Sequence, residues 1–476
     1  MRLIPLSLLI LFSIALLTSC KDEKKKHSLR EKFSVYSNQN QAVIFSGKVY
    51  LNTILENADY QHIPKINTLI SSEIKAFNQS IYLDSGIYFS VEGLLNKTGI
   101  PSVFNVFASI KNKESMEKKI ASLGLLLEHT NNLDYAIGPN YSVGIQDDIL
   151  IIHYQEQGEI SADHFYKLFK QLNKSEVTRT ELLKHDNKQA IQWTTHLENI
   201  YQLYANNINI HLDDLKQKEI ESLLKSAKLS STLTFESGGI SINTKHHFSR
   251  ALKNRLFFEK STANNLSTLS LGKATLGMSL QFNPLKIQTL VEDFIPDFFD
   301  QIGEIHGNIA LGMMALGNRP VTNLLGGRLA LIYFVESNSH SFHVTLGDAG
   351  KSISNLTQSF FSANPLYHLK INEKEIVGIG KNHVSKYQKL LIPNFAKDFG
   401  THGIDFFMDL NDFNVRQRAL VDTYPFLEAI SWIKISVNND GSMIRIQGKD
   451  PKIGILKQVS DVYIEKIRGA VSTFTY

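Results

Sequence analysis

The chain has 476 residues, of which 43% are hydrophobic and 20% are charged, and its formal net charge is +4. This length allows roughly two to four domains, and the hydrophobic fraction is ordinary for soluble domains. The net charge is small, and lysine and glutamate are mixed along the chain. The chain therefore lacks the strongly basic composition that is typical of proteins that bind nucleic acids.

Residues 1–19 have the organisation of a bacterial signal peptide. Arg2 supplies a positive n-region, and residues 3–17 form an apolar run that is short for a membrane span. Leu17-Thr18-Ser19-Cys20 matches the lipobox of bacterial lipoproteins, so we expect cleavage before Cys20 and attachment of diacylglycerol to its thiol. The alternative is an ordinary signal peptide in which a cysteine lies near the cleavage site by chance.

Cys20 is the only cysteine in the sequence. If lipid occupies its thiol, no thiol is left for a disulfide, a metal site or a nucleophile. A protein exported to an oxidising compartment must then be stable through its core alone.

A charged tract over residues 21–27 follows this cysteine, and we interpret residues 20–41 as the lipidated cysteine and a solvated tether. Cys20-Lys21-Asp22-Glu23 resembles the export signal of Bacteroidota surface lipoproteins, in which acidic residues just after the acylated cysteine direct transfer to the outer leaflet. The resemblance implies an outer-membrane lipoprotein that is displayed at the surface, with Lys21, Asp22 and Glu23 as the sorting signal. An anchor that faces the periplasm is the alternative.

The remaining sequence contains repeated patterns. Four segments begin alike, with a strand of alternating character that runs into a helix, and they start at Ala42, Ala190, Leu276 and Ile404. In the third, Asn283 before Pro284 predicts a helix cap followed by a proline at the first helical position.

Four further segments each contain two strands of period 2 around a tight turn, and they start at Tyr141, Leu229, Tyr367 and Trp432. Gly238-Gly239 and Asp440-Gly441 are expected to supply the positive φ values of two-residue hairpin turns. The turns at Asp147-Asp148 and Glu373-Lys374 lack glycine and are weaker predictions.

These openings and endings define units that alternate between long and short, over residues 42–157, 188–250, 274–382 and 402–468. We therefore expect two pseudo-duplicated halves, 42–260 and 270–476, joined by a polar linker at residues 261–265. Each unit should form a small antiparallel sheet covered by amphipathic helices. The predicted fold class is α+β, because hairpins rather than crossovers dominate.

Two motifs approach known binding sites. Residues 346–352 follow a strand and begin a helix, as a phosphate-binding loop does, but Thr345 stands where that loop requires its first glycine. His246 and His247 are adjacent in a predicted strand and point to opposite faces, so they are not expected to bind one metal ion together. No second metal-binding residue stands at a suitable spacing from His196.

No pattern of catalytic acids emerges. Asp147 and Asp148 lie in a predicted turn, where aspartate is favoured for backbone reasons. Asp405 and Asp409 share one strand face, but the matching positions after Leu276 are not acidic, and a Gly-x-Ser-x-Gly motif does not occur. We expect no catalytic residue, cofactor or metal site, so the assigned positions are Cys20 for lipidation and the three sorting residues.

The overall layout is a lipobox, a lysine-rich tether and a long α+β region with motifs such as Leu324-Leu325-Gly326-Gly327-Arg328. It resembles uncharacterised Bacteroidota lipoproteins of unknown function, which implies a location and a tandem arrangement but no activity. Three hypotheses remain open. The chain is a non-enzymatic envelope lipoprotein that presents a binding or assembly surface to a protein or glycan, a hydrolase of envelope or environmental polymers, or a carrier of a small apolar molecule or lipid.

Overall fold

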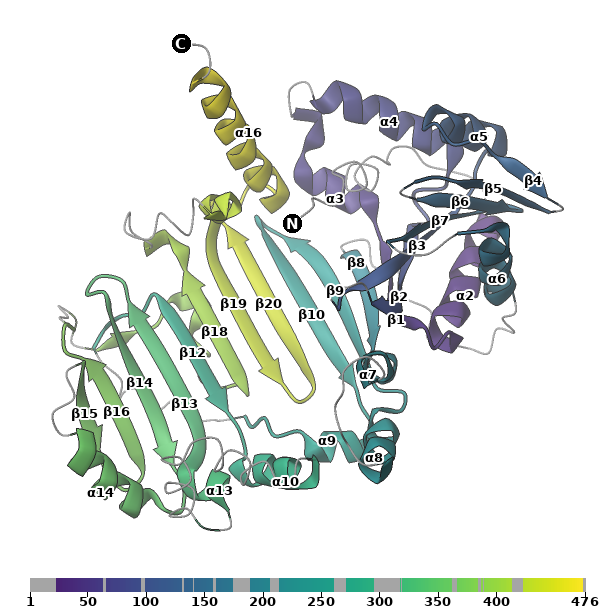
Figure 1. The fold of residues 1–476 in the computed structure, drawn as a ribbon. Helices are drawn as coiled ribbons and strands as arrows, with labels where there is room; N and C mark the ends of the chain where they lie inside the picture. Colours follow the sequence, from purple (N-terminus) through teal and green to yellow (C-terminus); the bar gives the residue numbers. More distant parts are fainter. Residues whose placement is uncertain are drawn as a thin grey trace. The chain divides into compact units, whose positions relative to one another are not determined.

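The computed structural model describes residues 23–62, 66–95, 99–130, 132–139, 141–156, 160–173, 189–205, 214–260, 271–294, 317, 319–361, 366–383, 387, 389–412 and 423–473. The described chain divides into two compact units. Unit 1 takes its residues from 1–211, 224–240 and 452–461, and unit 2 from 212–223, 241–451 and 462–476. Both combine helices with antiparallel strands (Figure 1), which confirms the α+β class. Within these ranges, no helix is both long and apolar enough to cross a membrane.

The strands of unit 1 pair antiparallel with their neighbours. Their spatial order is β9 (Lys228–Glu236), β8 (Gln189–His196), β1 (Val43–Val49), β2 (Ile87–Leu95), β3 (Pro101–Ser109), β7 (Ile149–Gln155), β6 (Ser142–Gln146), β5 (Leu133–Ile137) and β4 (Glu128–Thr130). The turn between β6 and β7 places Asp147 at a φ of +54°, so the hairpin expected there forms without glycine.

The core of unit 1 lies under two helices, α2 (Glu23–Gln39) and α6 (Ala162–Asn173) (Figure 1). The Phe33 ring of α2 lies 5.0 Å from that of Tyr88 and 5.2 Å from that of Phe107, and Phe165 and Phe169 of α6 are buried in the same cluster. Full burial of such a side chain contributes about 1.5–3 kcal/mol. The other helices here are α3 (Leu51–Ala58), η1 (Tyr60–His62), α4 (Ile66–Ser80), α5 (Lys113–Ser122) and α7 (Leu197–Ala205).

The position of α2 corrects the expected start of the folded region. The sequence placed a solvated tether up to residue 41, but α2 begins at Glu23, and Leu29, Phe33 and Tyr36 are buried. Charge near the cysteine concealed an amphipathic helix, because the apolar positions begin only at Leu29. A tether therefore ends before Leu29.

The strands of unit 2 also pair antiparallel. Their order is β10 (Gly239–His247), β20 (Gly441–Gly448), β19 (Ile430–Asn438), β18 (Ile404–Asp409), β12 (Leu276–Gln281), β13 (Leu325–Phe334), β14 (Ser339–Leu346), β16 (Glu375–Gly380) and β15 (Tyr367–Ile371). A separate parallel pair is formed by β11 (Gly272–Lys273) and β17 (Leu390–Leu391).

Helices α10 (Pro284–Phe294), α13 (Pro320–Leu324) and α14 (Gly350–Phe361) lie along one end of the unit 2 strands (Figure 1). The predicted cap of α10 is confirmed, since the Asn283 side chain accepts a hydrogen bond of 3.1 Å from the N–H of Lys286. The remaining elements are α8 (Asp214–Leu224), α9 (Arg250–Arg255), η3 (Asn394–Ala396), η4 (Leu410–Asp412), η6 (Pro425–Ala429) and α16 (Ile455–Thr473).

The sequence left open whether the small sheets join, and the structure joins them within each half, because β1 pairs with β8 and β12 pairs with β18. The boundary between the units differs from the expected one, since they do not divide at residues 260–270. Residues 241–260 belong to unit 2, where β10 pairs with β20. The expected linker at 261–265 lies outside the described residues.

Glycine is required in the two glycine-containing turns for different physical reasons. Gly238 has a φ of +66°, as predicted, but Gly239, for which a positive φ was also predicted, does not have one. Gly441 does not have a positive φ, so that prediction was wrong. A Cβ on Gly441 would lie 2.2 Å from the carbonyl oxygen of Thr244, so glycine is required there by the close approach of β10.

Candidate binding surface and pocket

The site residues assigned from the sequence lie mostly outside the described ranges. Cys20, Lys21 and Asp22 precede the first described residue, and Glu23 is described only as the first residue of α2. Lipidation and sorting therefore stay predictions. The features that the structure adds are a sheet face, a polar pocket and two buried polar clusters.

One face of the unit 2 sheet is apolar and is the more exposed of its two faces. The strand register places Phe406, Met278, Leu331 and Phe342 side by side across β18, β12, β13 and β14. Met278 is 49% exposed and Leu331 is 39% exposed. We call this the apolar face, and its residues are Ile404, Phe406, Met408, Leu276, Met278, Leu280, Leu329, Leu331, Tyr333, Phe342 and Val344.

The opposite face of the same strands is buried, yet it carries polar side chains. A row of Ser436, Asp405, Ser279 and His343 crosses β19, β18, β12 and β14, interrupted at β13 by Ala330. All five residues are at most 5% exposed. Antiparallel sheets with one solvated face normally bury the apolar side chains and expose the polar ones. The buried face of the unit 2 sheet combines both kinds, since Ile332, Phe334 and Phe407 are buried beside this polar row.

Asp405 is the centre of the buried polar row. Its Oδ2 accepts hydrogen bonds from the backbone N–H groups of Gly400, Thr401 and His402 at 2.8, 3.0 and 3.0 Å. Its Oδ1 lies 2.7 Å from Nδ1 of His402 and accepts from Ser436 at 3.1 Å.

Burial acts to raise the pKa of Asp405, but the hydrogen bonds from His402 and Ser436 prevail and lower it. The hydrogen bond with Asp405 in turn raises the pKa of His402. The carboxylate therefore fixes the turn at residues 400–402 and, with it, the position of the Gly400 carbonyl.

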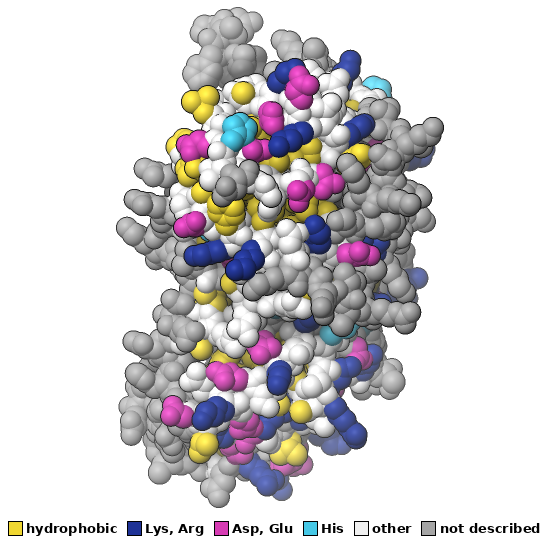
Figure 2. Space-filling model, turned by 90° about the vertical axis from the view of Figure 1, so that its right-hand side faces the viewer, with side chains coloured by type: hydrophobic (Ala, Val, Ile, Leu, Met, Phe, Trp, Pro, Cys, Tyr) yellow, Lys and Arg dark blue, Asp and Glu magenta, His cyan; other side chains and the backbone are white. Residues whose placement is uncertain are grey.

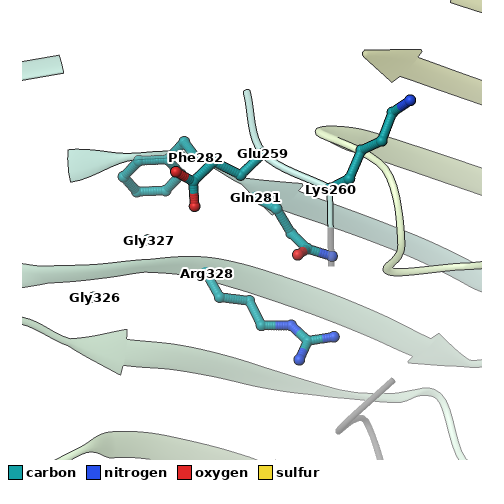
Figure 3. Close-up of a pocket in the computed structure, with 7 residues that line it drawn as sticks. All are labelled: Glu259, Lys260, Gln281, Phe282, Gly326, Gly327 and Arg328. Carbon is teal, nitrogen blue, oxygen red and sulfur yellow. The ribbon is translucent and has the colours of Figure 1, made fainter. Parts of the chain in front are cut away.

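A polar pocket of about 320 Å³ opens at one end of β12 and β13 (Figure 3). It is lined by Glu259, Lys260, Gln281, Phe282, Gly326, Gly327 and Arg328. The Arg328 guanidinium and the Gln281 amide extend the same way from neighbouring strands, whereas Lys260 extends away from them (Figure 3). The Gln281 amide donates to the carbonyl oxygen of Gly400. Among the described residues that line the pocket, Glu259 is the one carboxylate.

A second polar cluster lies in the core of unit 1. The Tyr36 hydroxyl donates to Glu92 at 2.6 Å, and the Asn105 amide donates to the same oxygen at 2.9 Å. Asn105 Oδ1 lies 2.7 Å from Nδ1 of His153, and that nitrogen lies 3.2 Å from Nε2 of His164.

Burial, reinforced by the nearby His164, lowers the pKa of His153 to about 4. Burial also raises the pKa of Glu92. The burial of this cluster therefore favours the uncharged form of both groups.

The loop at residues 346–352 cannot hold a phosphate in this conformation. The N–H groups of Gly347, Asp348 and Ala349 donate to the carbonyls of Leu324, Thr322 and Asn323 at 3.0–3.2 Å. A phosphate-binding loop needs those N–H groups for its ligand.

The histidines considered from the sequence are held by local contacts. His246 Nδ1 lies 3.0 Å from the carbonyl oxygen of Asn439, and His196 is 5% exposed. No cluster of metal-ligating side chains occurs among the described residues. Asp405 and Asp409 do share one face, as predicted, and both are buried.

The sequence did not identify which face of the unit 2 sheet is exposed, and it did not identify the pocket. Alternation alone gives two faces without saying which is covered. The signals that were available are polar residues at alternate positions of β12, β18 and β19, such as Ser279 and Gln281, and the Gly326-Gly327-Arg328 motif itself.

No family model matches the chain, and no curated protein matches it. Among solved structures, crystal forms I, III and IV of TP0453 are similar to it at 11%, 9% and 10% identity. The matches cover 45%, 48% and 43% of this chain and 79%, 89% and 76% of the TP0453 chain, with TM-scores of 0.24, 0.28 and 0.26. Similarity at this level assigns neither a family nor a function.

Proposed function

We propose that this chain is a non-enzymatic envelope lipoprotein, anchored at the outer membrane by acyl chains on Cys20, that uses the apolar face as its binding surface. The exposure of apolar side chains on this face, Met278 at 49% and Leu331 at 39%, carries this proposal. Apolar area left in water costs roughly 25 cal/mol per Å², so an apolar partner that covers the face gains that energy.

Acyl chains of lipid are the occupant that the chemistry of the face favours. Its residues include no lysine, arginine, aspartate or glutamate, so they offer contact area without a charge that a polar partner would have to match. The lipid on Cys20 would hold the protein at a bilayer, where acyl chains are abundant. A carrier of lipid is the second candidate function, because it would use the same face.

We also propose that the chain contains two pseudo-duplicated halves. The pairing order β9–β8–β1–β2–β3–β7 parallels β19–β18–β12–β13–β14–β16, with antiparallel neighbours throughout. Buried polar residues also recur at matching strands, since Ser46 and Asn105 correspond to Ser279 and His343. These parallels support duplication of a single scaffold.

The anchor can be tested by Cys20→Ser. Buried acyl methylenes contribute about 0.8 kcal/mol each, so two or three chains hold a protein almost permanently in a leaflet. The variant should accumulate as unprocessed precursor or as soluble protein with an unchanged fold, measured by fractionation, precursor size and circular dichroism. Processed variant that still sediments with carbonate-washed membranes would contradict the proposal.

The side of the outer membrane on which the protein is exposed can be tested with a second variant. Asp22→Ala/Glu23→Ala should keep the protein membrane-bound but lower its accessibility to external protease on intact cells, because receptors read such residues. Equal accessibility of the double variant and the wild type would leave the tract with only a tether role. Full protection of the wild type would place the protein in the periplasm.

The apolar face can be tested with Met278→Glu/Leu331→Glu in the soluble Cys20→Ser background. A fluorescent fatty acid should bind the background protein, and the double variant should weaken binding tenfold or more, or about 1.4 kcal/mol, because charge is placed in the contact area. Leu215→Glu is the matched control, since Leu215 is 80% exposed on α8. Its binding should be unchanged.

Two results would redirect this proposal. Equal fatty-acid binding by the double variant and the control would exclude the apolar face as the acyl site. If sedimentation shows a dimer that the double variant turns into a monomer, the face is occupied by a second copy of the chain instead of by lipid.

A further inference from the structure

Arg328 lies in the polar pocket with an incomplete set of hydrogen bonds. Its Nε is buried and has no hydrogen-bond partner among the described residues, and its Nη2 lies 3.5 Å from the carbonyl oxygen of Gly400, at the limit for a hydrogen bond. Among the described residues, the guanidinium forms no ion pair with a carboxylate. A partly buried cation in this state is costly unless an anion approaches it.

The neighbouring charged groups do not compensate Arg328. Glu259, the one carboxylate among the described residues of the pocket, accepts a hydrogen bond of 2.9 Å from the Asn283 amide, and it extends beside Phe282 (Figure 3). Burial lowers the pKa of Arg328, and no acid opposes this effect. The pocket therefore keeps a net positive character at the guanidinium.

Two glycines shape the backbone beside Arg328. The β13–β14 register shifts between Leu325 and Leu329, and Gly327 there has a φ of +94°. A Cβ on Gly326 would lie 2.5 Å from the carbonyl oxygen of Leu346, and one on Gly327 would lie 2.4 Å from that of Phe282. Only glycine fits this bulge, which takes Arg328 out of the regular β13–β14 ladder, while Arg328 stays paired with Gln281 of β12.

On the side of the pocket opposite the glycine bulge, Asp405 fixes the position of the Gly400 carbonyl. That carbonyl accepts the Gln281 amide and lies close to Nη2 of Arg328. The guanidinium is thus oriented by the fold, and its Nε has no acceptor among the described residues. Two parallel N–H donors of one guanidinium suit a carboxylate or a phosphate group.

We propose that the Arg328 pocket is a binding site for a small oxyanion, a carboxylate or a phosphate-bearing group, held by the guanidinium. The pocket volume of about 320 Å³ suits a small molecule or the end of a larger one. This site is distinct from the apolar face, and its test does not depend on the proposed function.

The test is calorimetric titration and thermal melting of the soluble Cys20→Ser protein with acetate, inorganic phosphate and glycerol phosphate at constant ionic strength. At least one of them should bind and raise Tm by about 2 °C or more at saturation. Acetate alone would identify a carboxylate ligand, inorganic phosphate would identify a free anion, and a preference for glycerol phosphate would identify a phosphoester such as a headgroup.

Arg328→Gln should weaken binding roughly tenfold or more and abolish the rise in Tm, because a charge-assisted hydrogen bond is lost. Without anions this variant should melt at or above the wild-type temperature, since a costly cation has been removed. Arg328→Lys should retain partial binding. Arg445→Gln, at an exposed position on β20, should respond like the wild type.

Three outcomes would overturn the inference. If none of the three anions binds the wild type, the pocket is not an oxyanion site. Equal responses of the wild type and Arg328→Gln would place the anion elsewhere. A large drop in Tm of Arg328→Gln in anion-free buffer would show that Arg328 is a structural residue.

Discussion

Asp405→Ala is expected to destabilise unit 2 by about 3–5 kcal/mol, the range for removing one partner of a buried, hydrogen-bonded charge. The carboxylate is 1% exposed and accepts from three backbone N–H groups, from Ser436 and from the His402 ring. The substitution leaves these donors inside the protein without an acceptor. We therefore expect the turn at residues 400–402 to open, and the Gln281 and Arg328 contacts with Gly400 to be lost.

The two tryptophans allow this effect to be measured in one unit. Trp193 lies in β8 of unit 1, and Trp432 lies in β19 of unit 2, stacked at 4.5 Å on Phe395. In a Trp193→Phe background, urea unfolding followed by fluorescence therefore reports on unit 2.

The matched control is Asp440→Ala, because the Asp440 side chain is 74% exposed in the β19–β20 turn. Its effect should stay within about 0.5 kcal/mol. If Asp405→Ala unfolds at the urea concentration of this control, the carboxylate holds neither the turn at residues 400–402 nor the Gly400 carbonyl in place.

The local sequence predicted most individual elements of the fold. Period-2 strands and turn residues located the hairpins, and the cap at Asn283 formed as expected, because these features depend on neighbouring residues. The turn at Glu373-Lys374 shows how a hairpin turn forms without glycine. There, Asn372 Oδ1 accepts from the N–H groups of Lys374 and Glu375 at 2.8 and 3.0 Å.

The features that decide the candidate sites depend on contacts distant in sequence. Joining β12 to β18 brings Ser279 beside Asp405, and no local pattern specifies that pairing. The same holds for Gly400 and Arg328, which are 72 residues apart in the chain. Gly441 shows the same limit, because the carbonyl of Thr244 that requires glycine belongs to another strand.

Acidification is expected to destabilise unit 1 between pH 6.5 and pH 4. Burial lowers the pKa of His153 from 6.5 to about 4, so the folded state binds its proton less readily than the unfolded state. The stability that the neutral ring contributes is complete above pH 6.5 and is lost as the pH falls towards 4. The change is about 3 kcal/mol, at 1.36 kcal/mol for each pKa unit.

Groups around His153 modify this dependence. The pKa of His164, which reaches the ring from α6, is also lowered by burial and by Lys167, and so adds to the loss on acidification. Burial raises the pKa of Glu92, which is linked through Asn105, and its protonation on folding acts in the opposite direction. His196 on β8, with a pKa lowered to about 4 by burial, adds a further loss of similar size.

His153→Gln should reduce the pH dependence, because an uncharged amide replaces the ring that must stay unprotonated. In a Trp432→Phe background, Trp193 fluorescence should show a loss of stability between pH 6.5 and pH 4 that is smaller in the variant by about 2–3 kcal/mol. His62→Gln is the control, since the His62 side chain is 76% exposed. A variant with the same pH slope as the wild type would show that His153 does not control the acid response of unit 1, whatever its effect on stability at pH 7.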